Sequence, residues 1–179
     1  QLDLQPRPRR LRQTSALRAL VEETDLKPAH LIQPLFVLEG SGKSERVDAM
    51  PGIERHSIDR TVEECARLID LGLGGVALFP VIDTAKKCDS AREALNPSSL
   101  IYRAIEAVRS HFPDWTVVAD LALDPYTLNG HDGIVPVGTV APDNDATVGI
   151  LEEMALLSAR VGATVVAPSD MMDGRVAAI

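Results

Sequence analysis

Four short apolar runs constrain the fold of this 179-residue chain more than any other feature of its sequence. The runs are rich in β-branched residues and nearly continuous rather than alternating, and they cover residues 30–38, 75–81, 115–123 and 164–168. Runs of this kind are typical of parallel strands buried on both faces of a sheet. The sequence therefore predicts an α/β fold.

Segments with helical periodicity lie between and after these runs, at residues 59–71, 98–112 and 145–161, with a shorter candidate at 15–23. Each of the three longer segments begins beside a residue that can cap a helix, and two end at a glycine. Four βα units fit this length, whereas a complete eight-unit barrel needs about 250 residues. The pattern alone thus predicts half of a barrel or a small doubly wound sheet. No glycine-rich phosphate loop follows any run, which disfavours a nucleotide-binding sheet.

The two ends of the chain suggest a piece of a longer protein. The first residue is Gln1, and the segment 171–179 stops where a helix is beginning. Residues 1–14 are predicted to form an extended basic arm. They carry prolines and four arginines, Arg7, Arg9, Arg10 and Arg12. The arm is either a solvated tail or a segment that binds a neighbouring, acidic subunit. Residues 15–179 would then be the first half of a single barrel domain.

The charge balance narrows the possible partners. Acidic residues number 26 and basic residues 18, giving a formal net charge of −8, which disfavours a non-specific nucleic-acid binder. No apolar run approaches the ~18 residues of a membrane span, and no secretion signal opens the chain. Cys65 and Cys88 form neither a disulfide framework nor a zinc pattern. We expect a cytoplasmic protein without nucleic-acid or membrane partners.

The densest group of reactive side chains follows the third apolar run, over residues 120–133. Active groups of parallel α/β folds gather at the carboxyl ends of the strands. Asp120 lies within the apolar run itself, where burial would raise the pKa of its carboxyl and suit it to proton transfer. Asp124 and Asp132 either join it at a site or only cap the turns at Pro125 and Gly133.

The other strand ends offer weaker candidates. After the fourth run, Ser169 and Asp170 either face a substrate or begin the next helix, and Arg175 either binds a carboxylate or pairs with Asp173. Met171 and Met172 are interpreted as core residues. After the second run, the lysines at 86 and 87 are conceivable Schiff-base residues but are interpreted as part of an exposed loop, and they would mildly acidify Cys88.

Two stretches resemble the signatures of one family, the porphobilinogen synthases (5-aminolevulinate dehydratases). They are Asp120–Gly133 and Ala167–Arg175, and weaker matches extend the resemblance over about residues 6–179. The resemblance implies a TIM (β/α)8-type barrel, of which this chain holds about the first four βα units plus an N-terminal arm. It also implies a homo-oligomer, an octamer in the family, and a lyase that condenses two 5-aminolevulinate molecules into porphobilinogen, with loss of two waters, in tetrapyrrole (haem) biosynthesis.

The resemblance further implies residue roles. Asp120, Asp124, Asp132 and Ser169 would be catalytic, and Ser169 and Asp170 would bind substrate. In the family two lysines form Schiff bases with the substrates, and they lie on later strands, past Ile179. No lysine of this chain matches them, those weighed being Lys27, Lys43, Lys86 and Lys87. The isolated chain is therefore expected to be inactive.

The metal preference is also implied by the resemblance. Zinc-using members carry cysteines at the positions of Ala122, Asp124 and Asp132, and carboxylate oxygens suit Mg²⁺ better than zinc. We expect the aspartate-rich branch, with no zinc and no metal ligand in this chain. An allosteric Mg²⁺ would bind between subunits, through a carboxylate beyond Ile179.

Two other functions stay open. A non-catalytic half-barrel could act as an assembly or binding module through its arm, and a different barrel lyase could use Mg²⁺ with aspartates. Under every interpretation, four strands leave open edges at the first and the fourth, so the isolated chain is predicted to be poorly stable or to aggregate unless it pairs with a second copy.

Overall fold

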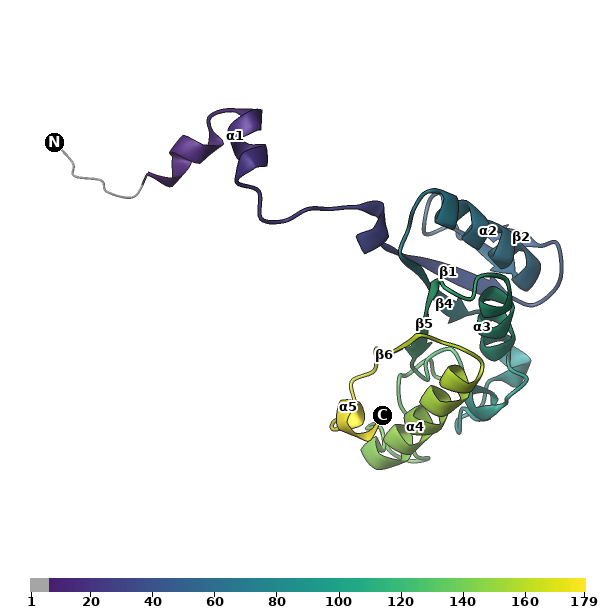
Figure 1. The fold of residues 1–179 in the computed structure, drawn as a ribbon. Helices are drawn as coiled ribbons and strands as arrows, with labels where there is room; N and C mark the ends of the chain where they lie inside the picture. The colour runs from purple at the N-terminus through teal and green to yellow at the C-terminus, as the bar shows by residue number, and fades with distance from the viewer. Residues whose placement is uncertain (1–6) are drawn as a thin grey trace.

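A computed structural model describes residues 7–179, and its centre is a six-stranded sheet with the order β2-β3-β1-β4-β5-β6 (Figure 1). The four predicted apolar runs form neighbouring parallel strands of this sheet: β1 (Ile32–Leu38), β4 (Gly75–Pro80), β5 (Thr116–Leu121) and β6 (Val165–Pro168). The predicted α/β class and the parallel sheet are confirmed.

Two strands were not predicted, β2 (Ser44–Arg46) and β3 (Glu54–Ser57). β3 pairs in parallel with the end of β1, residues Phe36–Leu38, and β2 pairs antiparallel with β3. The prediction that the first strand leaves an open edge is therefore wrong over Phe36–Leu38. Both strands are short and polar, so they lack the apolar run that identified the others.

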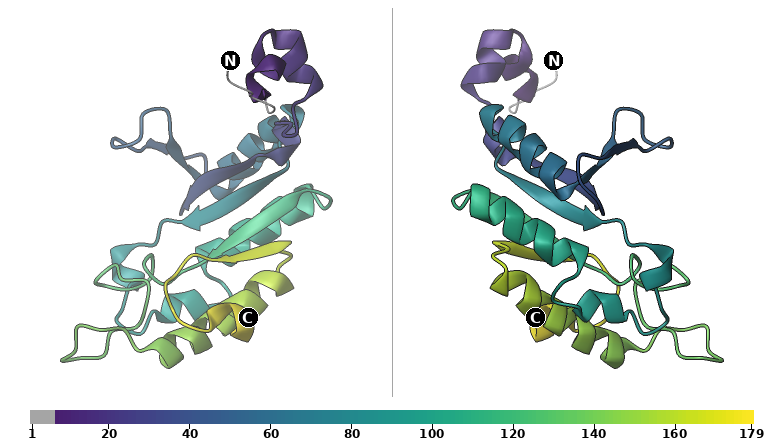
Figure 2. Two further views of the ribbon diagram at one scale, coloured as in Figure 1. Left: turned by 90° about the vertical axis from the view of Figure 1, so that its left-hand side faces the viewer. Right: turned by 90° about the vertical axis from the view of Figure 1, so that its right-hand side faces the viewer.

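Three helices, α2 (Ile58–Asp70), α3 (Leu100–His111) and α4 (Asn144–Arg160), cover the same face of the sheet (Figure 2). They match the predicted segments to within two residues at each end. Short helical segments complete the described elements: η1 (Pro8–Arg12), α1 (Ser15–Leu20), η2 (Pro28–His30), η3 (Thr84–Lys86), η4 (Arg92–Leu95) and α5 (Arg175–Ala178). Among the helices of residues 7–179, none combines the length and apolar character that a membrane crossing requires.

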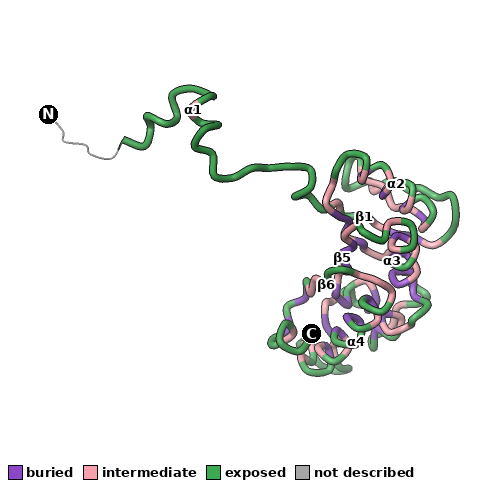
Figure 3. The backbone as a smooth tube through the Cα atoms, viewed as in Figure 1, coloured by how far each residue is buried: buried purple, intermediate pink, exposed green. Residues whose placement is uncertain are grey.

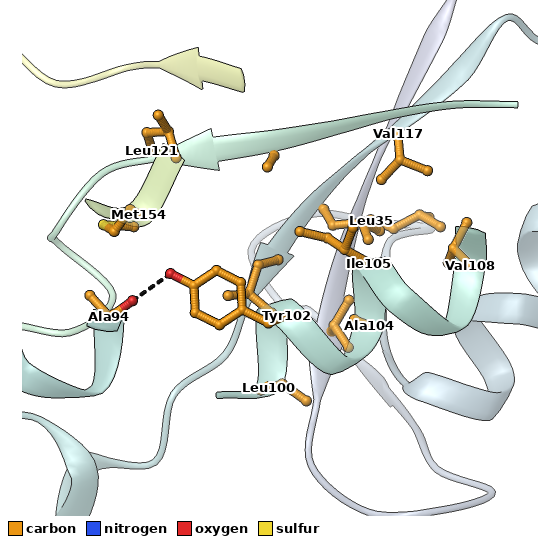
Figure 4. Packing of buried hydrophobic residues seen from close by; sticks show 14 of the residues in the cluster. Leu35, Ala94, Leu100, Tyr102, Ala104, Ile105, Val108, Val117, Leu121 and Met154 are labelled. Atoms are coloured by element: carbon orange, nitrogen blue, oxygen red, sulfur yellow. Dashed lines mark hydrogen bonds between the residues drawn. The ribbon is translucent and has the colours of Figure 1, made fainter. Parts of the chain in front are cut away.

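The hydrophobic core lies between the sheet and these helices. Ile105 and Val108 of α3 are fully buried and belong to one cluster with Val117 and Leu121 of β5 (Figure 4). Tyr102 of α3 is also buried, and its hydroxyl donates a hydrogen bond to the carbonyl of Ala94 in η4. The helices thus anchor one face of the sheet and leave the other face free for polar side chains.

The N-terminal segment extends away from this core (Figures 1 and 3). Residues 8–26 are exposed apart from Leu17, including the large apolar side chain of Leu20, which is 80% exposed. The predicted arm contains the short helix η1, and α1 follows it, capped by the Thr14 hydroxyl, which accepts a hydrogen bond from the Leu17 N–H. Residues 1–6 of the predicted arm lie outside the described residues.

Candidate active site

A pocket of about 520 Å³ lies at the carboxyl ends of the central strands. The four residues predicted to be catalytic, Asp120, Asp124, Asp132 and Ser169, all line it. They come from β5, from the loop that follows β5 and from the residue after β6. The structure therefore brings together side chains that are up to 49 positions apart (169 − 120) in the sequence, while their roles stay predictions.

The alternation of side chains along β5 and a tight turn after this strand direct the carboxylates of Asp120 and Asp124 into the pocket. Leu121 is buried in the core, so its neighbour Asp120 faces the opposite side of the sheet and the pocket. The chain then turns at Leu123, whose carbonyl accepts hydrogen bonds from the N–H groups of Tyr126 (2.9 Å) and Thr127 (3.0 Å). Because Tyr126 and Thr127 are buried, this turn is fixed, and Asp124 projects from it into the pocket.

Further along this loop, His131 acts as a structural residue. Its Nδ1 accepts a hydrogen bond from the Gly133 N–H (3.0 Å), and its carbonyl accepts one from the Thr127 hydroxyl (3.0 Å). The Gly133 N–H is therefore satisfied by His131, and Asp132 faces the pocket instead of capping that turn.

Burial and mutual repulsion raise the pKa values of two of these carboxyls. For Asp120 burial is the main cause; the Ser169 hydroxyl opposes it, and the charges of Asp132 and Asp170 add to it. For Asp124 burial again dominates, and the charges of Asp132 and Asp120 raise the pKa further. Carboxyls with raised pKa values in a pocket are candidates for proton transfer near neutral pH.

The segment after β6 divides its residues between the pocket and the interior. Ser169 lines the pocket, and its N–H donates to the Leu121 carbonyl (3.3 Å). Asp170 is only 4% exposed and is not among the residues that line the pocket. Its Oδ2 accepts a hydrogen bond from the Met172 N–H (2.7 Å). The predicted substrate-binding role of Asp170 stays a prediction, because its contacts in this structure are internal.

The carboxylate of Asp170 is also the ion-pair partner of Arg175. Asp170 Oδ1 lies 2.8 Å from Arg175 Nε, close enough for an ion pair but without the angle of a hydrogen bond. Pairing of Arg175 with Asp173, one of the predicted alternatives, is therefore wrong. Met172 is buried as predicted, whereas Met171 is 63% exposed, so the prediction of a core position for it is wrong.

Two cationic side chains also line the pocket: Arg55, which the sequence did not identify, and Lys87, which was interpreted as part of an exposed loop. Arg55 reaches it from β3, whose register places Arg55 opposite Phe36 of β1. Lys87 is half-buried at the pocket, which corrects the interpretation that both lysines of the loop are exposed. Lys86 does point outward, with its Nζ 3.2 Å from Glu39 Oε1. Only the strand pairing and the loop path could reveal Arg55 and Lys87.

The acidic donor groups that line the pocket are the carboxylates of Asp120, Asp124 and Asp132. Ala122, one of the positions compared with zinc-binding cysteines, is a buried side chain without a donor atom. Within residues 7–179, no three His, Cys, Asp or Glu side chains are grouped so that they could hold a metal ion.

Comparison with known proteins places this architecture. Residues 5–179 match a family model described as "Delta-aminolevulinic acid dehydratase". Proteins of that name from Bradyrhizobium diazoefficiens and Chlamydia pneumoniae are 44% and 43% identical to the chain, covering 99% and 98% of it and 50% and 52% of the relatives. A relative from Selaginella martensii, named as chloroplastic, is 46% identical over 99% of the chain and 42% of its own length. The chain thus spans about half the length of the curated relatives it matches.

A solved structure agrees with these matches. The delta-aminolevulinic acid dehydratase (porphobilinogen synthase) of Toxoplasma gondii, solved with its reaction product porphobilinogen, superposes with a TM-score of 0.92 and is 44% identical. The match covers 100% of this chain and 51% of that one. The sheet is therefore part of a TIM barrel, and the alternative of a small doubly wound sheet is wrong.

Proposed function

The chain belongs to the delta-aminolevulinic acid dehydratase family, and from this premise we propose that it is the carboxylate-bearing part of an enzyme that makes porphobilinogen. The reaction condenses two molecules of 5-aminolevulinate with loss of two waters. One observation carries the proposal: Asp120, Asp124, Asp132 and Ser169 converge on one pocket in a chain that superposes on a protein solved with porphobilinogen.

The chemistry of the pocket suits this substrate. 5-Aminolevulinate carries an ammonium group and a ketone, and the ketone becomes a cationic iminium when a lysine attacks it. Carboxylates at the pocket wall stabilise both cations, and a carboxyl with a raised pKa can exchange protons with the reacting carbons. Phe36 and Phe79, with ring centroids 5.9 Å apart, add an apolar surface on the same pocket.

The first test is turnover by the full-length enzyme, meaning residues 1–179 together with the remaining half of the family's length. It should convert 5-aminolevulinate to porphobilinogen, and Asp124→Ala should lower kcat by about 10²–10⁴-fold, since that is the usual contribution of a positioned acid or base. Circular dichroism checks that the fold is intact, and Asp114→Ala, at an exposed turn, is the matched control. An unchanged kcat in D124A would remove Asp124 from the mechanism.

We also propose that the Schiff-base lysines lie outside residues 1–179. Because Lys87 lines the pocket, the proposal has to be tested against this residue directly. Borohydride reduction of the full-length enzyme in the presence of 5-aminolevulinate should leave adducts that peptide mapping locates. Adducts outside residues 1–179 support the proposal, and an adduct on Lys87 contradicts it.

For the cofactors, we propose that the full-length enzyme works without zinc and responds to Mg²⁺. The support for this proposal is the set of carboxylate side chains with Ala122 beside them, which lacks the thiolates that favour zinc. No ligand for Mg²⁺ is assigned to this chain. Activity should survive a zinc-selective chelator and rise on addition of Mg²⁺; loss of activity that zinc alone restores would overturn the proposal.

Assembly through the N-terminal arm together with the segment that follows it, up to residue 26, is proposed on the exposure of apolar side chains in this segment. Leu20 and Leu26 are 80% and 75% exposed, although burying such side chains is favourable. We propose that residues 7–26 pack on another subunit of a homo-oligomer. Deleting residues 1–26 should reduce the mass measured by light scattering for the full-length enzyme, and an unchanged mass would exclude the arm as the contact.

A further inference from the structure

Lys87 lies in a loop that is fastened at several points. The Cys88 N–H donates a hydrogen bond to the Tyr126 carbonyl (3.1 Å), and Tyr126 belongs to the turn that carries Asp124. Before Lys87, the Asp83 carboxylate caps η3 by accepting from the Ala85 N–H (2.9 Å). The backbone of Lys87 is therefore held against the turn that presents Asp124.

An ion cluster outside the pocket fixes the neighbouring Lys86. Its Nζ lies 3.2 Å from Glu39 Oε1 and 3.7 Å from Glu93 Oε1, and Arg103 also donates to Glu39 Oε1 (2.6 Å). Glu39 directly follows β1, whereas Arg103 lies on α3. Lys86 thus points away from the pocket, whereas the next side chain, Lys87, lines it.

The side chain of Lys87 meets a strongly anionic wall there. Asp120, Asp124 and Asp132 line the same pocket, and Lys87 forms no salt bridge with any acid in residues 7–179. Its positive charge nevertheless lowers the pKa of Asp124, against the larger effect of burial. Lys87 is thus a half-buried cation that lies at the same pocket as the carboxylates and is not engaged in a salt bridge within residues 7–179.

We propose that Lys87 is a positioning residue for the reaction: its ammonium offsets the repulsion among the three carboxylates and keeps Asp124 ionised in the pocket. The inference rests on the proposed function of this pocket. The other groups around Asp124 are Asp120 from β5, Asp132 from the same loop, Ser169 after β6 and Arg55 from β3. Lys87 differs from Arg55 in that its own loop is hydrogen-bonded to the Asp124 turn.

The kinetic test is the pH profile of kcat/KM in the full-length enzyme, which reports ionisations of the free enzyme. Lys87→Met removes the charge that favours ionised Asp124, so the pKa of Asp124 rises and the acid limb should move up by about 0.5–1 pH unit. Lys87→Arg keeps the charge and should leave the limb in place. Lys86→Met, which disturbs the ion cluster but leaves Lys87, is the matched control.

Two kinetic outcomes would overturn the proposal. If K87M raises KM while the acid limb stays where it was, Lys87 binds the substrate and does not act through Asp124. If K86M moves the limb as far as K87M does, the effect comes from the structure of the loop and not from the charge at position 87.

A second measurement needs no turnover, so it separates this proposal from the proposed function. In a double-mutant cycle at pH 7, K87M should lower the Tm more in the parent enzyme than in the Asp124→Asn background, where the carboxylate charge is gone. Equal shifts in both backgrounds would show that the two residues are not coupled. If the parent makes no porphobilinogen, the proposed function fails while this cycle still decides whether Lys87 acts on Asp124.

Discussion

At the residue scale, the two cysteines show how strongly the surroundings set reactivity. Cys65 is buried on α2, and burial raises the pKa of its thiol to about 12. The pKa of the Cys88 thiol is lowered to about 7, first by the Ser90 hydroxyl (3.4 Å) and then by the Arg92 N–H (3.4 Å). The predicted acidification of Cys88 agrees with this direction, but the cause is local hydrogen bonding and not the adjacent lysines.

Alkylation should therefore distinguish the two thiols. The thiolate is the reactive form, so the rate for Cys88 should be half-maximal near pH 7, fall at lower pH and reach a plateau above it. Native Cys65 should stay unmodified. Iodoacetamide labelling followed by peptide mass mapping measures both, and Ser90→Ala should move the Cys88 midpoint to higher pH. Equal labelling of the two cysteines in the native protein would contradict the assignment.

The residues of the site differ in how far the sequence could reveal them. Asp120 lies within a nearly continuous apolar run, Asp124 and Asp132 follow it, and the carboxyl end of a parallel strand is where active groups gather. Arg55 and Lys87 carry no such signal. Arg55 reaches the pocket because of the register of a strand that was not predicted. Only the path of the loop shows that Lys87, and not Lys86, faces the pocket.

At the element scale, the junction between η2 and the sheet leaves no space for a side chain at Gly74. A Cβ there would lie 2.2 Å from the carbonyl oxygen of Ala29 in η2. The Gly74 N–H donates to the Leu31 carbonyl (3.0 Å), and the preceding Leu73 carbonyl accepts from the Trp115 indole (2.8 Å). This glycine lets the segment before β4 run directly against η2.

Gly74→Ala should therefore destabilise the protein by about 1–3 kcal/mol, because the backbone on both sides must shift. Gly149→Ala in α4 is the matched control, because nothing lies within 4 Å of a Cβ placed there. This change should raise the free energy of unfolding by about 0.5–1 kcal/mol, since alanine has a higher helix propensity than glycine. Thermal unfolding of the two variants measures both effects. A Tm for G74A equal to or above that of the parent would contradict the close approach.

The elements that were predictable are those with a long periodic or continuous pattern. β1, β4 and β5 are nearly continuous apolar runs, and α2 to α4 begin beside residues of a capping type and carry an apolar face. β2 and β3 have three and four residues, mostly polar, and they form because β1 offers an edge at Phe36–Leu38. That pairing is a tertiary contact, which no local pattern could indicate.

At the scale of the whole molecule, the sheet of residues 7–179 has unpaired edges. β6 pairs with β5 alone, and its Val165 is 45% exposed. On the other side, β3 covers only Phe36–Leu38 of β1, and Ile32 is 51% exposed. Unpaired edges with apolar side chains template association with other chains.

Residues 1–179 expressed alone should accordingly aggregate or associate. The physical reason is that the interior of a TIM barrel is packed by side chains from all of its strands, so this part of the sheet has lost many of its neighbours. Size-exclusion chromatography with light scattering and thermal melting near pH 7 provide the measurement. A monomer that melts cooperatively would contradict the prediction.

The opposite directions of Lys86 and Lys87 have a consequence for comparing sequences of this kind. Inserting one uncharged residue between Lys87 and Cys88 would leave the charge of the loop unchanged. It would nevertheless move Lys87 out of the inward position, because the Cys88–Tyr126 hydrogen bond holds the residue that directly precedes Cys88 against the Asp124 turn. Alignment gaps in this loop therefore matter more than substitutions between its basic residues.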